Sequence, residues 1–462
     1  MAATEVTSDG SVIPPLNISV PAPILNLKGF EWGTVDQKIE GTQLREEAVL
    51  PSLTSRAAAP ALQEQPAALP AQLAQQLEKP KEPFSPSFPL EHFKGTYAGN
   101  GFNLIWRPRP DDDKTFATKP EGPDDNILEL NLTTEQLTFG ENLGKIPNRG
   151  LGKQSDIDLA GVPYLQTVQD VTYPATGRGD NPVATGIHFE PGVWLHVPKS
   201  RFHTQDTPSV VRMASIPHGT TINAQGLVPT RGQVTKTPTI KPINTTPFFF
   251  GKPDAPVPFF NKSMDATFQN AFRIPQNLEL FNKNGTITSA IIKDPHNVLR
   301  NAIHGQEITE TVSFEVSTGP PEAQINGGGT ANISFLDGEE PIGANQIPPP
   351  NPNANVDFMK STFWIEKVNY QVHVKAQNVQ STLKLSPDMS KSPTAPTPVF
   401  YVTTPPGGVR EDTTITVPGI QIQYSQTVNL NFGPGGGPNI LTWPHVSVAT
   451  LVPTTPQTFK MT

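Results

Sequence analysis

The feature that most constrains this fold is a regular alternation of side chains between Gly186 and Pro198, which reads Gly-Ile-His-Phe-Glu-Pro-Gly-Val-Trp-Leu-His-Val-Pro. Successive side chains of an extended strand point to opposite faces of the sheet. One face of this strand holds Ile187, Phe189, Val193, Leu195 and Val197, and the other holds His188, Glu190, Trp194 and His196. The second row suits a strand that lines a ligand cavity. The alternative is a solvated outer face, because antiparallel sheets commonly expose one side to water.

Composition and segment order both indicate an all-β chain. The 52 prolines and 36 glycines among 462 residues, with only 16% charged residues, favour many short strands joined by loops. Strand-like runs without intervening helical periodicity cover 95–106, 127–138, 164–171, 187–197, 209–224, 279–293, 307–317, 361–374, 413–432 and 441–451. An up-and-down barrel or a sandwich fits this succession. We predict an antiparallel up-and-down barrel of about ten strands, because closure removes exposed edges and can enclose one small ligand.

The chain is predicted to consist of a leader and one larger domain. Residues 1–84 include an Ala-, Gln- and Pro-rich stretch, which predicts an extended segment with one short helix at 73–77. Residues 85–462 are predicted to form a single barrel domain. Segments rich in loop-forming residues at 225–270 and 319–356 predict long connections within it.

Charge, hydropathy and cysteine usage exclude several classes of partner and site. The net charge is −8 and no dense Lys/Arg stripe occurs, so we expect no nucleic-acid partner. No continuous apolar stretch is long enough to predict a membrane span. The absence of cysteine excludes disulfides, thiolate metal sites and thiol nucleophiles. Together with the lack of a recognisable secretory signal, it favours a cytoplasmic location.

Two strands repeat a Trp-x-His pattern, as Trp194-Leu195-His196 and Trp443-Pro444-His445. A spacing of two places the indole and the imidazole on the same strand face. Neutral imidazole is the commonest metal ligand among side chains, and an aromatic neighbour suits a flat organic ligand. A hydrogen-bonded structural or surface histidine is the alternative for each. His188 and Glu190 form a conceivable metal pair, but no obvious third ligand lies nearby in the sequence.

Four segments together resemble nitrobindin and its relatives, the heme-binding branch of the fatty-acid-binding-protein-like calycin barrels. Phe93 to Gly101 is similar to the opening Gly-Thr-aromatic-x-Gly-x-Gly strand, and His188-x-Glu190-x-Gly192-x-Trp194 to the His-x-Glu-x-Gly-aromatic strand. Arg212 to Gly226, with Pro217-His218-Gly219 at its centre, resembles the following strand pair and its turn. The strand that begins at Tyr424 leads to Leu441–Leu451, which resembles the closing His-Leu-x-Ala-x-Leu strand.

This resemblance implies a calycin-like barrel that binds heme, with His445 as the axial ligand of the iron. It also makes His188, Trp194 and His196 candidates for the cavity wall or for contacts with the propionates. The spacing of two places Trp443 on the same strand face as His445. Family members bind nitric oxide and are credited with isomerising peroxynitrite to nitrate, so a similar heme-centred activity is expected. The known barrels are shorter, which implies insertions near 228–280 and 319–356.

Two further hypotheses compete with heme binding. A non-enzymatic carrier of a fatty acid or another apolar molecule would have an elongated cavity, with Arg212 or Tyr424 available to hold a carboxylate. A self-assembling structural β protein would suit the abundance of Pro, Thr and Asn. The expected partner is a small hydrophobic or planar ligand, and the sequence does not fix the oligomeric state.

Overall fold

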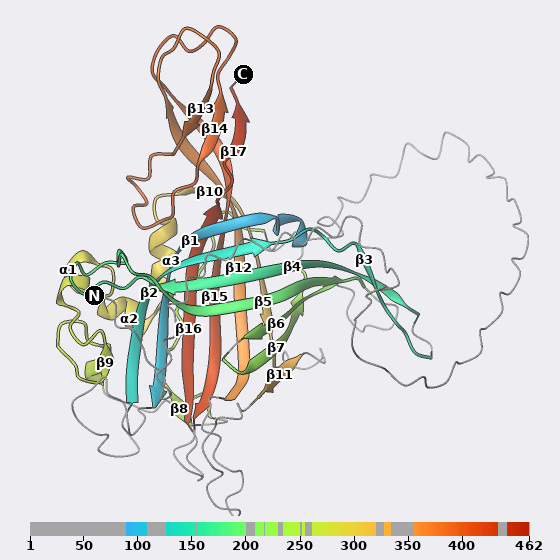
Figure 1. The fold of residues 1–462 in the computed structure, drawn as a ribbon, viewed down its shortest axis with the longest axis vertical. Helices are drawn as coiled ribbons and strands as arrows, with labels where there is room; N and C mark the ends of the chain where they lie inside the picture. The colour runs from blue at the N-terminus through green and yellow to red at the C-terminus, as the bar shows by residue number, and fades with distance from the viewer. Residues whose placement is uncertain are drawn as a thin grey trace, which may run out of the picture. The chain divides into compact units, whose positions relative to one another are not determined.

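Ten strands close into an antiparallel barrel in the computed structural model, which describes residues 89–108, 126–152, 155–199, 208–216, 218–229, 234–249, 252–254, 261–319, 328–333, 355–432 and 441–461 (Figure 1). The strands follow one another around the barrel in chain order, and β2 pairs with β4 while β16 pairs with β1 to complete the circle. The barrel strands are β1 (Gly95–Pro108), β2 (Asn126–Phe139), β4 (Ile157–Asp170), β5 (Thr185–Val197), β6 (Ser209–Ile216), β7 (Thr220–Leu227), β10 (Glu307–Ser317), β12 (Asn355–Val374), β15 (Thr413–Phe432) and β16 (Leu441–Pro453). The predicted all-β, up-and-down barrel of about ten strands is confirmed.

Short strands extend this sheet at its margins. They are β3 (Lys145–Asn148) on β4, β8 (Phe248–Phe249) on β16, β9 (Arg273–Ile274) on β2 and β11 (Gly329–Asn332) on β7. The strand-like run over 209–224 is a hairpin of β6 and β7, which turns at His218 and Gly219, where the strand pair implied by the resemblance has its turn. Gly219 has a φ of 95°, a conformation that glycine adopts without the steric penalty of a side chain.

The barrel interior is filled over part of its length by aromatic side chains. Phe93, which follows the short 3₁₀ helix η1 (Leu90–His92), stacks on Phe139 with ring centroids 4.5 Å apart. Trp194 packs edge-on against Phe363 at 5.2 Å, and Phe314 lies stacked on Phe363 at 5.5 Å. All five rings are buried, so this part of the barrel is a packed core.

The long connection between β7 and β10 carries helices that cover part of the outer barrel wall. They are α1 (Glu279–Asn284), α2 (Ser289–Lys293) and α3 (His296–Ile303), and the connection also contains the 3₁₀ helix η3 (Asn261–Met264). Phe281, Ile292 and Leu299 from the helices join one apolar cluster with Leu104 and Val446 from the barrel strands. The outward side chains of β1, β2 and β16 that belong to this cluster, such as Leu104, Leu130 and Val446, are therefore buried rather than solvated.

The strand predicted over 279–293 is wrong, because local capping signals end one helix there and begin another. Gly285 adopts a left-handed conformation with a φ of 71° and terminates α1. The Thr288 hydroxyl then accepts a hydrogen bond from the backbone N–H of Ile291 and caps the start of α2. The apolar residues of this stretch fitted both patterns, and the caps decide between them.

A second sheet of three strands lies beyond the barrel strands and was not predicted. It consists of β13 (Thr382–Leu385), β14 (Phe400–Thr403) and β17 (Gln457–Lys460), with β14 and β17 parallel. Phe400 and Val402 are fully buried in the same cluster as Val372 from the end of β12. The second sheet thus shares a core with the extended ends of the long strands.

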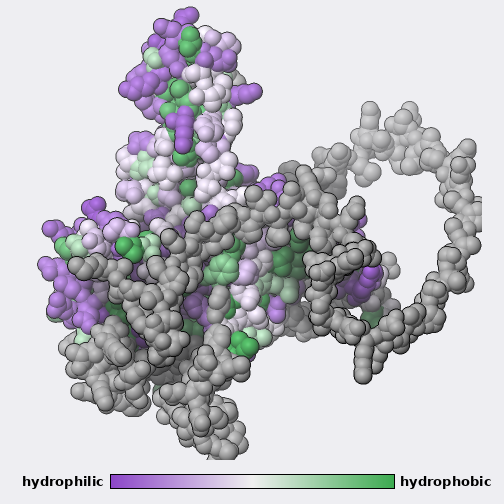
Figure 2. All heavy atoms as spheres, in the orientation of Figure 1, coloured by the Kyte–Doolittle hydropathy of each residue, from purple (hydrophilic) through white to green (hydrophobic). Residues whose placement is uncertain are grey.

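The outward apolar face of β5 is only partly covered. Phe189, Val193, Leu195 and Val197 are all of intermediate exposure. Ile187, predicted for the same face, instead lines the barrel cavity, because the pairing of β4 with β5 shifts register beside it. Figure 2 shows hydrophobic atoms on this outer wall, bordered by hydrophilic ones. The opposite face of β5 points into the barrel, as the cavity-lining interpretation of its alternation requires.

Several sequence-based predictions fall outside the described residues. The leader at 1–84, with its short helix at 73–77, lies wholly outside them, as does most of 319–356. Among the described helices, none has the length and apolar character needed to cross a membrane.

Candidate functional site

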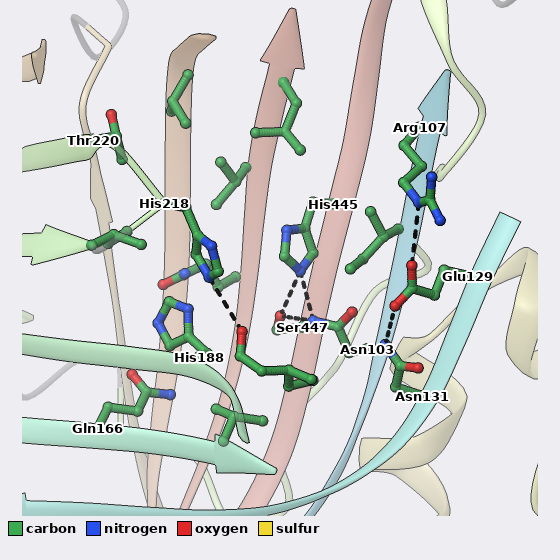
Figure 3. A pocket seen from close by; sticks show the side chains of 18 of the residues that line it. Asn103, Arg107, Glu129, Asn131, Gln166, His188, His218, Thr220, His445 and Ser447 are labelled. Carbon is green, nitrogen blue, oxygen red and sulfur yellow. Dashed lines mark hydrogen bonds and ion pairs between the residues drawn. The ribbon is translucent and has the colours of Figure 1, made fainter. Parts of the chain in front are cut away.

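The barrel encloses a cavity of about 450 Å³ beside the aromatic core, and its walls combine apolar and polar side chains (Figure 3). This volume lies within the range of small-molecule sites. The apolar lining residues are Ile105, Val168, Ile187, Ile216, Val356, Val428 and Leu430. The polar ones include Asn103, Arg107, Glu129, Asn131, Gln166, His188, His218, Thr220, Tyr424, Gln426, His445 and Ser447.

One wall is built where β1 pairs with β16, and it carries His445. The register places Asn103 opposite Ser447 and Ile105 opposite His445. The Asn103 side-chain amide donates to His445 Nε2 at 2.6 Å and to Ser447 Oγ at 2.8 Å. In this orientation of the Asn103 amide, His445 Nε2 is the acceptor, which is the unprotonated nitrogen of a neutral imidazole.

The protonation state of His445 agrees with this hydrogen bond. Burial, together with the nearby imidazoles of His188 and His218, lowers the pKa of His445 to about 3. A buried histidine without a carboxylate partner favours its uncharged form. His445 is therefore a neutral imidazole whose Nε2 is engaged by its own wall.

A second wall, formed by β5 and the β6–β7 turn, brings two more imidazoles to the cavity. The rings of His188 and His218 are stacked, with centroids 5.9 Å apart and planes inclined by 28°. His218 Nε2 lies 3.2 Å from the carbonyl oxygen of Ile187, and His218 is an exposed residue. These two histidines mark the part of the cavity that faces solvent.

On the same strand as His188, the carboxylate of Glu190 is fully buried and forms an ion pair with Arg212. Glu190 Oε1 accepts from Arg212 at 2.6 Å and from the Tyr164 hydroxyl, while Oε2 lies 3.2 Å from His188 Nε2. Burial alone would raise the pKa of Glu190, but the Arg212 guanidinium outweighs it and holds this pKa at about 2. Glu190 is therefore an ionised carboxylate inside the barrel.

All three guanidinium nitrogens of Arg212 donate hydrogen bonds to side chains in the protein interior. Its Nε donates to Tyr164 and Glu190, and its two terminal nitrogens also reach Ser361, Gln426 and Gln166. Its guanidinium also lies 5.7 Å from the Trp194 ring centroid, within cation–π range. Arg212 is 1% exposed and does not line the cavity.

Tyr424 links the cavity to a second buried carboxyl group. Its hydroxyl donates to Glu135 Oε2 at 2.5 Å and accepts from Gln166 Nε2 at 2.9 Å. Burial raises the pKa of Glu135 to about 7, against the lowering effect of these hydrogen bonds. With its hydroxyl engaged on both sides, Tyr424 presents mainly its ring to the cavity.

The structure brings together three of the seven residues singled out in the sequence. His188, Tyr424 and His445 line the cavity. Arg212 and Trp194 lie in the core next to it, and His196 is buried near the opposite end of β5. Trp443 belongs to the apolar cluster that the helices cover, so the indole and the imidazole of the Trp443-Pro444-His445 motif do not share the cavity.

Three polar features of the cavity were not predicted: Asn103, Ser447 and the ion pair between Arg107 and Glu129. In this pair, Arg107 Nε lies 3.4 Å from Glu129 Oε2. The signal for Asn103 was present, since it follows Tyr97 at even spacing on β1 and so shares its inward face. His218 had been assigned only to a turn. Its place at the cavity depends on how that turn folds over β5.

No cluster of histidine, aspartate and glutamate in the described part of the chain has the arrangement of a metal site. Comparisons of the chain with protein-family models, with curated proteins and with solved structures found no match.

Proposed function

We propose that this protein binds a small, uncharged and largely apolar organic molecule in the barrel cavity. The observation that carries the proposal is the cavity itself, with about 450 Å³ of space bounded by apolar side chains from several strands. Burial of apolar ligand surface there supplies the main driving force. The polar groups at its edges supply orientation.

The charges around the cavity favour an uncharged ligand over a fatty acid. Arg107 is paired with Glu129, and Arg212 is paired with Glu190 in the protein interior. The low pKa of His445 leaves this imidazole neutral at pH 7. A ligand carboxylate would lose its hydration without gaining an uncommitted cation, which is unfavourable in a buried site.

Replacing Ile105 with tryptophan is expected to weaken ligand binding by about tenfold or more, because the indole occupies cavity volume; such a loss corresponds to about 1.4 kcal/mol. The measurement is fluorescence titration with N-phenyl-1-naphthylamine, an uncharged apolar probe. Met213→Trp, at a residue 41% exposed, adds the same ring elsewhere and should leave binding unchanged. Tighter binding of the carboxylate probe parinaric acid than of the neutral probe would contradict the assignment of charge.

Heme is a second candidate, and His445 is the observation that favours it, since a neutral cavity-lining imidazole has the donor chemistry of an axial ligand. The geometry does not fit as it stands. His445 Nε2 is 2.6 Å from the Asn103 amide nitrogen, so Asn103 occupies the position from which an iron would approach that nitrogen. Heme binding through Nε2 therefore requires the Asn103 side chain to turn away.

Replacing Asn103 with alanine is accordingly expected to raise hemin affinity about three- to tenfold, because it removes one hydrogen bond that competes for Nε2. Absorption titration with hemin measures this through the Soret band. His445→Ala should show no specific band. A band of equal intensity in the wild type and in His445→Ala would refute histidine ligation.

A further inference from the structure

We propose that His188 acts as a general base in the cavity and activates water for the hydrolysis of a small uncharged ester. This inference rests on the proposed function, since the cavity must first admit an uncharged molecule. It adds an activity to binding. The arrangement that carries it is the contact between the cavity-lining His188 and the buried carboxylate of Glu190.

The two carboxylate oxygens of Glu190 have different partners. Arg212 and Tyr164 both bind Oε1, whereas His188 Nε2 lies 3.2 Å from Oε2. A carboxylate only accepts hydrogen bonds, so His188 Nε2 carries the proton. In the neutral imidazole, Nδ1 is then the basic nitrogen.

Burial and packing hold this pair in place. The Glu190 side chain is 0% exposed and fixed by Arg212, so it cannot rotate without breaking a buried ion pair. The His188 side chain is 17% exposed and lines the cavity, next to the stacked ring of His218. A histidine that is oriented by a carboxylate and open to a binding cavity is the arrangement of a general base.

The reaction balances with water as the only co-reactant. His188 Nδ1 takes a proton from water as the water oxygen bonds to the ester carbonyl carbon. When the tetrahedral adduct collapses, the bond to the alkoxy oxygen breaks, and the imidazolium returns the proton to the leaving alkoxide. The products are an alcohol and a carboxylic acid. The acid ionises and then carries a charge that the cavity does not compensate, which favours its release.

The test is hydrolysis of p-nitrophenyl acetate by the full-length protein. His188→Gln should lower kcat/KM by about 10²- to 10⁴-fold, the usual contribution of a positioned base. The glutamine amide can still donate to Glu190, so the fold and the buried pair are retained. His373→Ala removes a solvent-exposed imidazole that does not line the cavity and should leave the rate unchanged.

Two further readouts separate catalysis from structure. His188→Gln should bind N-phenyl-1-naphthylamine normally, so that its lower rate reflects the chemical step and not a loss of the cavity. Ile105→Trp should lower hydrolysis together with probe binding. A wild-type rate no greater than that of His188→Gln, with probe binding intact, overturns the catalytic inference and leaves the binding proposal standing. Absence of probe binding defeats the binding proposal itself.

Discussion

Replacing Arg212 with methionine is expected to lower the free energy of unfolding by about 3–5 kcal/mol, the range observed when one partner of a buried ion pair is removed. Without the guanidinium that compensates it, Glu190 would have to stay charged in the barrel interior or take up a proton, and both cost free energy. The acceptors Ser361, Gln426 and Gln166 would each lose a donor as well. Urea denaturation followed by tryptophan fluorescence measures the change.

A matched control is Arg107→Met, since Arg107 also pairs with a glutamate but retains 28% of its side-chain exposure. Ion pairs that are partly solvated contribute about 0–1 kcal/mol, so this variant should unfold near the wild-type midpoint. Equal destabilisation by the two substitutions would show that burial does not determine how much Arg212 contributes to the free energy of unfolding.

Replacing Glu366 with glutamine is expected to stabilise the protein by about 3–5 kcal/mol at pH 9 and to leave stability at pH 4 nearly unchanged. Burial raises the pKa of Glu366 to about 8, whereas an unfolded glutamate titrates near pH 4.3. The folded-state pKa is raised, so this contribution is fully present below about pH 4.3 and is lost as pH rises through 8. Gln421 Nε2 donates to Glu366 Oε2 at 2.5 Å and can donate equally to an amide oxygen.

The measurement is the unfolding free energy between pH 4 and 9 for the wild type and for Glu366→Gln. The wild-type curve should fall more steeply across this range. Glu135 contributes a similar slope in both proteins because its pKa is raised to about 7. Glu411→Gln, at an exposed position, should reproduce the wild-type curve. Parallel curves for the wild type and Glu366→Gln would mean that the pKa of Glu366 is not raised in the folded protein.

The sequence was sufficient to predict the barrel because strand alternation is a local property with a period of two. The inward row of β5 illustrates this, since Glu190 and Trp194 are fully buried, as a non-solvated row requires. Helix caps are equally local, and the error over 279–293 arose because Gly285 and Thr288 were not weighed as a C-cap and an N-cap.

The site was harder to predict, because the position of a cavity depends on which side chains fill the rest of the barrel interior. Alternation placed Arg212 inside the barrel but could not supply its partners, which come from several different strands. It also grouped Trp443 with His445, although Trp443 packs into the cluster under the helices. Which inward residues surround the cavity is decided by aromatic residues such as Phe93 that occupy the remaining volume.

The pairing of β1 with β16 joins the first and last barrel strands. It therefore determines when, during synthesis and folding, the cavity can form. Asn103 and His445 are 342 residues apart in the chain and meet only across this seam. During synthesis, the wall that holds His445 cannot exist until nearly the whole barrel has emerged from the ribosome. Contacts of such long range also form slowly. Only a closed barrel can therefore bind a ligand in the cavity. A ligand that contacts both β1 and β16 would stabilise the pairing between them.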